Sequence, residues 1–188
     1  ADQVALAATN VIPDTAKSGV LARTDSNIKT AQDLVGKKVG VPGLGGLLDV
    51  VYRKWLDDQK VDTRKVTYVE TSFPAMSDIL KSGNVDAVVA VDPFYSRILG
   101  QGTGYLVDDY TKTLPNGTIA SVYSATSKWA KANPEAVKAF QEALVEAIAF
   151  AKSNETAARE SLAKYTKLPP PVVANLPIPN LIAKMDAS

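Results

Sequence analysis

A cluster of glycines between a β-branched segment and an amphipathic segment has the clearest chemical potential in this sequence. Gly43, Leu44, Gly45 and Gly46 follow residues 37–42, which read as a short strand. Where a strand leads through glycines into the first turn of a helix, unpaired backbone N–H groups attract an anion. The turn therefore predicts a site for a carboxylate or sulfonate. The sequence of the turn matches neither the dinucleotide-binding motif Gly-x-Gly-x-x-Gly nor a P-loop. The alternative interpretation is a tight turn that needs glycine only for its backbone freedom and binds no ligand.

Two further predicted strands end in loops that carry hydroxyl, aromatic and acidic side chains. The carboxyl ends of parallel strands meet at one edge of a sheet, so we expect these loops beside the glycine turn. There, aromatic rings would stack on a ligand and a hydroxyl would bond to it. Asp92 as a helix cap and Phe94 in core packing are the alternatives for these two residues. The candidate ligand-binding residues are Gly43, Leu44, Gly45, Gly46, Thr71, Ser72, Phe73, Asp92, Phe94 and, from a later strand, Tyr123.

Residue types suited to catalysis are scarce. The chain contains no cysteine and no histidine, which removes the usual thiol nucleophile, the common general base near neutral pH and the best zinc ligands. The adjacent acids Asp57–Asp58 and Asp108–Asp109 point in different directions and are expected on solvated surface. Ser127 beside Lys128 is explained by helix capping. We therefore expect no catalytic residue, no metal site and no cofactor.

The elements that must position these residues alternate between strands and helices. Alternating elements of this kind favour an α/β fold with an open sheet and a ligand at the carboxyl ends of its strands. The final third reads as helical, because Val137, Phe140, Leu144, Ile148 and Ala151 form an apolar stripe. Strands are predicted at residues 37–42, 66–70, 86–91, 105–107 and 118–125. Helices are predicted at 47–60, 75–82 and 93–99, from a first turn at 127 that restarts at 133–135 and continues to 151, at 154–165 and from 169.

The overall composition narrows the classes of partner. Hydrophobic residues make up 46% of the chain, and 21 Lys and Arg balance 20 Asp and Glu to a net charge of +1. This balance is typical of a soluble globular protein and provides no basic stripe for nucleic acid. No apolar run approaches the ~18 residues that span a bilayer. We therefore expect neither a nucleic-acid partner nor a membrane-spanning segment.

Four blocks of sequence, in a fixed order, carry a family resemblance. Residues 19–23, 28–41, 81–87 and 92–94 resemble the substrate-binding proteins of sulfonate, nitrate and taurine ABC transporters, often grouped with thiamine-precursor-binding proteins. The resemblance implies a type II periplasmic-binding-protein lobe, with an open mixed sheet flanked by helices, followed by C-terminal helices. It also implies a small, anionic organic ligand held between two lobes, an ABC transporter permease as partner, and a periplasmic or extracytoplasmic location. No signal peptide is visible in these residues.

The same resemblance implies a division of the chain. Residues 1–22 would be a remnant of the first lobe with a hinge strand, 23–118 the second α/β lobe, and 119–188 the return hinge strand and the C-terminal helical region. Members of the family begin with a first-lobe segment, so about 100 residues, one small domain, would have no counterpart here. Such a chain would expose apolar surface, and a homodimer through that surface is the hypothesis that follows.

Two other classes share this type of fold. The ligand-sensing domain of a transcription regulator has the same clamshell architecture, although the sequence shows no helix-turn-helix for DNA. Biosynthetic enzymes that make the thiamine pyrimidine also resemble the fold, but they rely on histidine and cysteine, which this chain lacks. We therefore expect a binding protein rather than an enzyme, with the sensor domain as the first alternative.

Overall fold

The protein consists of two compact units. The computed structural model describes residues 2–12, 17–166 and 170–183, and contacts between residues group them into two sets. Unit 2 is the continuous segment Ala16–Pro115, and unit 1 combines Ala1–Thr15 with Asn116–Ser188. The chain therefore passes from one unit to the other twice.

Unit 2 is built on a five-stranded mixed sheet with the strand order β5-β4-β6-β3-β7. Strand β4 runs parallel to both of its neighbours, β5 and the central strand β6, whereas β3 runs antiparallel to β6 and β7. This arrangement confirms the predicted open mixed α/β sheet. Its strands are β3 (Ser18–Arg23), β4 (Lys38–Val41), β5 (Thr67–Glu70), β6 (Ala87–Val91) and β7 (Gly104–Asp108).

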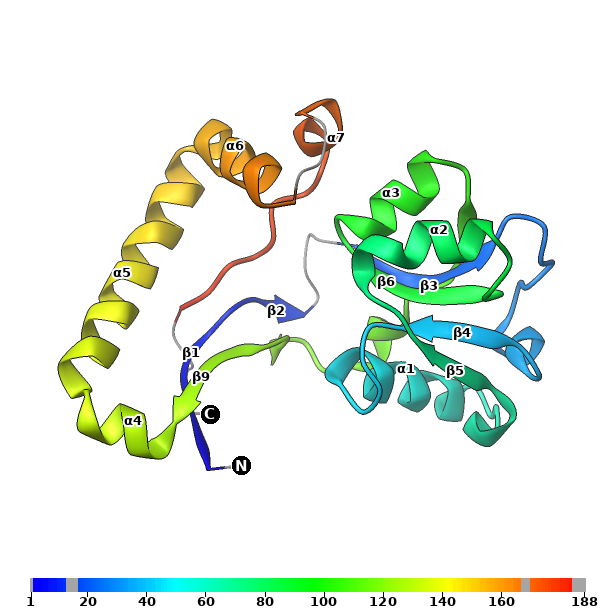
Figure 1. Ribbon diagram of the computed structural model, residues 1–188, viewed down its shortest axis with the longest axis horizontal. Coiled ribbons are helices and arrows are strands. Elements are labelled where there is room, and N and C mark those ends of the chain that lie inside the picture. The colour runs from blue at the N-terminus through cyan, green and yellow to red at the C-terminus, as the bar shows by residue number, and fades with distance from the viewer. Residues whose placement is uncertain (1, 13–16, 167–169, 184–188) are drawn as a thin grey trace. The chain divides into compact units, whose positions relative to one another are not determined.

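Helices cover both faces of this sheet. Figure 1 shows α2 and α3 on one face and α1 on the other. Along β3, Leu21 packs with α2 and α3, whereas Val20 and Ala22 pack with α1. Burial on both faces explains why β3 and β6 read as continuous apolar runs. The helices are α1 (Leu47–Asp58), α2 (Met76–Lys81) and α3 (Phe94–Gly100), with short 3-10 turns η1 (Ala31–Leu34), η2 (Thr63–Lys65), η3 (Phe73–Ala75) and η4 (Tyr110–Thr113).

The domain boundaries expected from the family resemblance differ from the boundaries of the compact units. Residues 18–22 were expected in the first-lobe remnant and its hinge strand. In the structure they belong to β3, which pairs with β6 and β7 inside unit 2. The second crossing lies between Pro115 and Asn116, close to the expected boundary at 118.

Unit 1 combines two short antiparallel strand pairs with a run of helices. The strand expected over residues 118–125 is divided into two strands, and between their ladders Ser121 O accepts the N–H of Thr9 and Ala120 N donates to Asn10 O. Strand β1 (Gln3–Ala8) pairs with β9 (Val122–Thr126), and β2 (Val11–Ile12) pairs with β8 (Thr118–Ile119). The helices are α4 (Ser127–Ala132), α5 (Pro134–Ser153), α6 (Glu155–Thr166) and α7 (Pro170–Ala174).

The first residues of α4 and α5 agree with the sequence-based prediction, but the residue that caps α4 differs from the predicted one. Ser127 was expected to cap α4, but Thr126 does so, since its Oγ1 accepts the N–H of Trp129 at 3.2 Å. Ser127 is the first helical residue, and its hydroxyl donates to Asp2 at 2.7 Å. Helix α5 begins at Pro134 as predicted. The predicted helix start at residue 169 lies outside the described residues.

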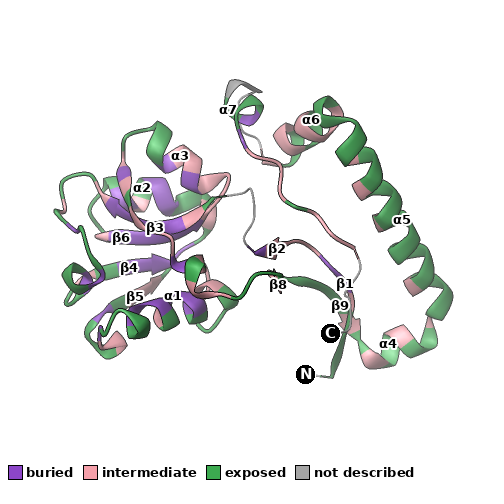
Figure 2. Ribbon diagram, turned by 180° about the vertical axis from the view of Figure 1, so that it is seen from behind, coloured by how far each residue is buried: buried purple, intermediate pink, exposed green. Residues whose placement is uncertain are grey.

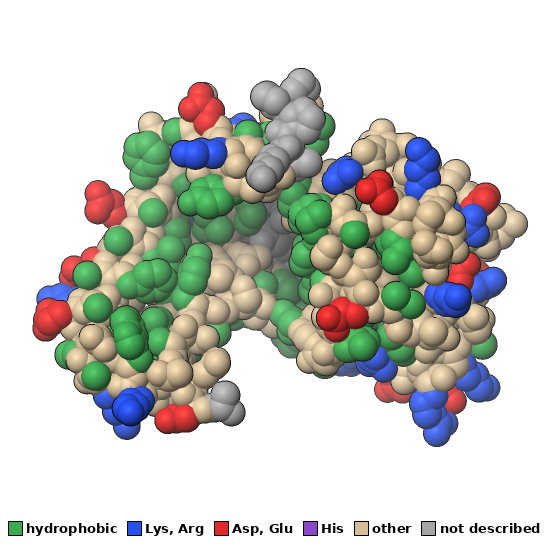
Figure 3. Space-filling view, in the orientation of Figure 1, with side chains coloured by type: hydrophobic (Ala, Val, Ile, Leu, Met, Phe, Trp, Pro, Cys, Tyr) green, Lys and Arg blue, Asp and Glu red, His purple; other side chains and the backbone are tan. Residues whose placement is uncertain are grey.

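Helix α5 is amphipathic but largely exposed. It is described over its whole length and contains no buried residue, although four of the five stripe residues are less exposed than their neighbours. The exception is Phe140, which is 38% exposed and packs edge-on against Tyr123 of β9, with ring centroids 5.3 Å apart. Figure 2 shows this contrast with the buried sheet of unit 2, and Figure 3 shows hydrophobic side chains gathered along α5.

Nothing in the described part of the chain forms a helix that is both long enough and apolar enough to cross a bilayer.

Candidate functional site

The carboxyl ends of three parallel strands bring most of the candidate residues to one edge of the sheet in unit 2. Strands β4, β5 and β6 run in the same direction, so the segments 42–46, 71–73 and 92–94 leave the sheet at the same edge. Tyr123 is the exception, because it lies on β9 in unit 1, where it lines an apolar hollow of about 400 Å³ beside α4 and α5.

The glycine turn differs from the expected nest of unpaired N–H groups. Gly46 is the N-cap of α1, and its N–H donates to Gly43 O at 3.1 Å. The N–H of Leu44 donates to Glu70 Oε2 at 3.1 Å, and that of Gly45 donates to Asp49 Oδ2 at 2.8 Å. Each of the three consecutive donors therefore already has an internal acceptor, two of which are carboxylates.

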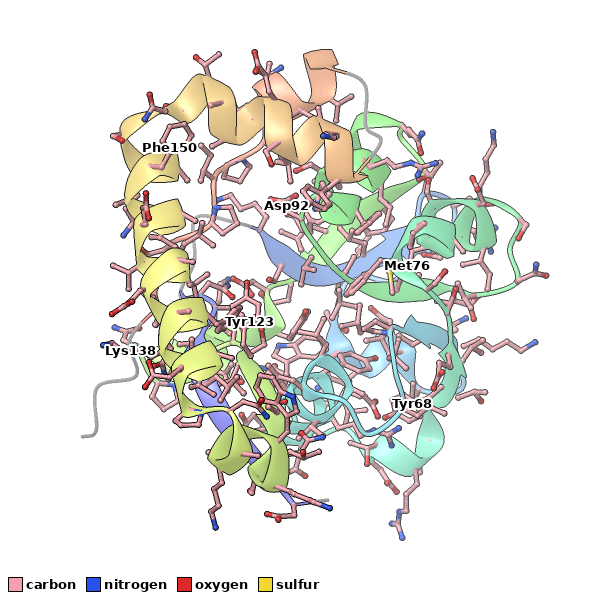
Figure 4. All side chains as sticks on the ribbon, turned by 60° about the vertical axis from the view of Figure 1, so that its left-hand side comes forward. Tyr68, Met76, Asp92, Tyr123, Lys138 and Phe150 are labelled. Carbon is pink, nitrogen blue, oxygen red and sulfur yellow. The ribbon has the colours of Figure 1, made fainter. Side chains whose placement is uncertain are left out.

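Asp49 holds the turn from inside α1. Its side chain is 2% exposed, and its second oxygen accepts the Nε–H of Arg53 at 2.8 Å. The Arg53 guanidinium in turn lies 3.5 Å from the ring centroid of Tyr68, on β5, and Figure 4 labels this tyrosine. Sequence reasoning missed both Asp49 and Glu70. Asp49 is the third helical residue after the N-cap, a position where acidic side chains bond back to the preceding turn, and that signal identifies it.

Thr71 is positioned by packing. It is 8% exposed, and its N–H donates to Val41 O at 2.9 Å. A Cβ on Gly40 would lie 2.9 Å from Thr71 Cγ2, so the glycine is required for this close approach. Ser72, the next residue, is exposed at the start of η3. Contact of either hydroxyl with a ligand stays a prediction.

The two aromatic candidates form a stacked pair. Phe73 and Phe94 lie with ring centroids 5.4 Å apart and an interplanar angle of 7°, and each is half-buried. This pair joins the loop after β5 to the start of α3. Offset stacking of this kind stabilises a rigid apolar surface.

Asp92 caps α3. Its Oδ1 accepts both the N–H of Ser96 at 3.1 Å and the hydroxyl of Ser96 at 2.5 Å, while Oδ2 accepts the N–H of Lys17 at 2.7 Å. Both oxygens therefore have internal donors, as the helix-cap interpretation of this residue requires. Figure 4 labels Asp92 where β6 leads into α3.

The surface around the turn is apolar as well as polar. Leu44 and Leu47 are 53% and 44% exposed, although both are large aliphatic residues. Together with the stacked phenylalanines, they give this edge carbon surface beside backbone donors. Such a mixture is typical of sites for small organic molecules with one polar group.

Metal-ligating side chains do not cluster in the described residues. No cluster of three or more His, Cys, Asp or Glu side chains there could hold a metal ion. Asp108, expected on solvated surface, instead accepts the indole N–H of Trp55 at 3.2 Å and bonds to Lys112 at 3.2 Å. Partial burial raises the pKa of Asp108, but hydrogen bonds from the Asp109 N–H, Lys112 and Trp55 outweigh it and lower this pKa below its ordinary value.

Comparison with known proteins assigns the chain to a family. Residues 5–167 match the NMT1-like family. A curated protein of Escherichia coli (strain K12), named as a binding protein for aliphatic sulfonates, is 29% identical over 159 residues, which are 83% of this chain and 48% of that protein. The chain thus spans about half the length of this relative.

Solved structures place the fold. The periplasmic aliphatic sulphonate binding protein SsuA from Escherichia coli matches with a TM-score of 0.78 and 26% identity, over 100% of this chain and 63% of that one. The desulfurization enzyme DSZB matches with a TM-score of 0.68 and 20% identity over 98% and 68% of the two chains, which shows the fold alone. The fold is thus shared by a binding protein and an enzyme. The predicted resemblance to sulfonate-binding proteins and the predicted periplasmic-binding-protein fold are confirmed, and the chain belongs to the NMT1-like family.

Proposed function

We propose that this chain is a solute-binding component of an ABC importer and that the edge of unit 2 contacts a small organic anion. One observation carries the proposal: the segments 42–46, 71–73 and 92–94 leave three parallel strands at the same edge. The glycine turn, the exposed Ser72 and the stacked aromatic pair thus lie at one edge of the sheet. The relatives named as sulfonate-binding proteins support the same class of ligand.

In this proposal the ligand lies between two lobes. Unit 2 supplies the second of these lobes, and Tyr123 of β9 is a further proposed ligand contact. An ABC transporter permease then receives the ligand, and the protein acts in the periplasm or in an equivalent extracytoplasmic space. The periplasmic relative supports this location.

The apolar side chains at the edge favour an organic anion over an inorganic one. Leu44, in the turn, and Leu47, just after it, are exposed, and the Phe73–Phe94 pair is half-buried at the same edge of the sheet. An inorganic anion such as nitrate would leave this carbon surface uncovered. An alkyl or aryl group on the ligand would bury it and gain about 25 cal/mol per Å² of apolar surface removed from water.

We further propose that binding, rather than catalysis, is the activity of this chain. It contains no histidine or cysteine to act as a general base or thiol nucleophile. Asp92, the acid nearest the aromatic pair in sequence, is already bonded through both oxygens. Absence of turnover with sulfinates and sulfonates, measured as sulfite release, is the expected result.

Calorimetric titration tests the ligand class. We expect heat of binding with an alkanesulfonate or an aromatic acid and a much weaker response to nitrate or a pyrimidine. Phe73→Ala should weaken binding of the organic anion about tenfold, because a stacked ring contributes on the order of 1 kcal/mol beyond its buried area. Leu99→Ala is the matched control, since Leu99 is 38% exposed on α3 and lies outside the candidate edge. Binding of nitrate alone, or equal loss in both variants, would contradict the proposal.

A homodimer through unit 1 is a second proposal, carried by the apolar surface of that unit. Its exposed large hydrophobic residues include Tyr123, Trp129 and Phe140, which line the hollow beside α4 and α5. Contiguous apolar surface of this kind marks interaction sites. Light scattering during size-exclusion chromatography should show a dimer, and Phe140→Lys should shift it to monomer. Val50→Lys, at an exposed position on α1 of unit 2, is the control. A monomer at high protein concentration would exclude the dimer.

A further inference from the structure

The donors of the glycine turn differ in how firmly their acceptors are held. Gly46 donates to the backbone carbonyl of Gly43. Gly45 donates to Asp49, a carboxylate that is 2% exposed and tied to Arg53. Leu44 donates to Glu70, which lies at the surface. An external anion can therefore gain a backbone donor among these three only by replacing Glu70.

Glu70 is suited to being replaced. Its backbone is fixed, since it ends β5 and pairs in register with Val41, whereas its side chain is exposed. The Leu44 N to Glu70 Oε2 distance is 3.1 Å, against 2.8 Å for the Gly45–Asp49 bond. Hydrogen bonds to a carboxylate are strongest at about 2.7–2.9 Å, so the Glu70 contact is the weaker of the two. It can open without unfolding any element.

We propose that Glu70 is an internal competitor of the ligand: its carboxylate occupies the place of the ligand's acidic group at the Leu44 N–H, and the ligand binds by displacing it. This inference rests on the proposed function, because it requires an anion to bind at the turn. Glu70 also sets specificity. An anion gains little by exchanging one carboxylate for another and must overcome the repulsion of the displaced Glu70, so only a ligand that also covers Leu44, Leu47 and the phenylalanine pair binds well.

Removing the charge of Glu70 should make the turn accept simple anions. In Glu70→Gln the side chain at position 70 is neutral and binds the Leu44 N–H more weakly. A probe anion then competes with no carboxylate for this N–H and is not repelled by one. We expect methanesulfonate and acetate to bind about tenfold more tightly to Glu70→Gln than to the unmodified chain, the scale of one close charge in a solvated site. Asp78→Asn is the matched control, because it removes one exposed negative charge from unit 2 on α2, away from the turn.

The amide resonances of the glycine turn measure these anion affinities directly. The ¹⁵N–¹H signals of residues 43–46 are followed while methanesulfonate, and separately acetate, is added to the unmodified chain and both variants. Tighter binding in Glu70→Gln alone supports the competitor. Equal affinities in all three proteins overturn the competitor but leave anion binding at the turn intact. The absence of shifts at residues 43–46 in every protein overturns both the competitor and the anion site.

A measurement without ligand guards against a folding defect. In Glu70→Ala the Leu44 N–H loses its acceptor, so its exchange with water should accelerate at least about tenfold relative to the unmodified chain. The Gly45 N–H, bonded to Asp49, should exchange at its original rate and shows that the turn stays folded. An unchanged rate at Leu44 would mean that Glu70 does not hold this donor in solution, which overturns the proposal.

Discussion

Unit 2 buries its apolar side chains on both faces of a sheet, whereas unit 1 leaves many of its own at the surface. Leu21, Val88 and Ile98 in unit 2 are 0% exposed, while Trp129 and Phe150 in unit 1 are 46% and 57% exposed. Both units contain amphipathic helices. The difference lies in what those helices pack against: α1, α2 and α3 cover a five-stranded sheet, whereas α5 lies in a unit whose sheets have two strands each.

The comparison teaches that an apolar stripe predicts a helix but does not predict its burial. A two-stranded sheet is marginal on its own, and three or more strands or a packed helix are needed to close a core. The site follows the same division. The edge of β4, β5 and β6, where the ligand contact is proposed, belongs to the unit with the closed core, and a site on packed strands should hold its geometry better than one on loops alone.

The largest expected effect is on the free energy of unfolding when a core side chain is shortened, and it tests whether the two units differ in packing. Leu21→Ala, in the interior strand β3 of unit 2, should lower the free energy of unfolding by ~2–5 kcal/mol, because it leaves a cavity between β3 and α2. Phe140→Ala in unit 1 should lower it by only about 1 kcal/mol, since that ring is already partly in water. Urea unfolding followed by circular dichroism measures both. Comparable losses would show that unit 1 is packed as tightly as unit 2.

A smaller loss of unfolding free energy is expected from adding a methyl group inside the sheet of unit 2. A Cβ on Gly104 would lie 2.7 Å from the backbone oxygen of Ala22 and 2.9 Å from Leu80 Cδ2, whereas one on Gly100 would meet nothing within 4 Å. Gly104→Ala should therefore cost ~1–3 kcal/mol of unfolding free energy. Gly100→Ala should change it by less than ~0.5 kcal/mol. Thermal melts of the two variants test the difference, and equal melting temperatures would argue against close packing of β3 on β7.

The smallest effect concerns surface charge. Lys54 and Asp58 form an exposed ion pair on α1, with 2.8 Å between Lys54 Nζ and Asp58 Oδ2. Lys54→Ala should cost at most ~0.5 kcal/mol, because solvent and salt screen such pairs. Urea midpoints at low and high salt provide the measurement. A loss as large as that of Leu21→Ala would mean that unit 2 depends on its surface rather than on its core.

Much of unit 2 could be predicted from the sequence because its signals are local. The strand at Ala87–Val91 reads as continuously apolar since both of its faces are covered, and the segment after Gly46 shows helical spacing. Parallel strands then place their carboxyl ends at one edge, so the meeting of the three loops also follows from the order of elements.

The rest depends on contacts between distant residues. No local pattern indicates that Glu70 reaches the Leu44 N–H across the ladder, or that Thr71 packs over Gly40. The division of the strand expected over 118–125 lies where Thr9 O accepts the N–H of Ile182, more than a hundred positions later. The stripe on α5 has the spacing of a buried helix, and only the three-dimensional packing shows that Phe140 stays partly exposed.

Hydrogen exchange over the whole chain tests the central difference most directly. Backbone amides of β3 and β6, enclosed between two layers of helices, should exchange at least about a thousandfold more slowly than those of α5, since buried strands open only with the unit. That result would place the proposed ligand-contacting edge on the rigid part of the molecule. Equal protection in α5 and in the central strands would contradict it, because unit 1 would then hold a closed core of its own.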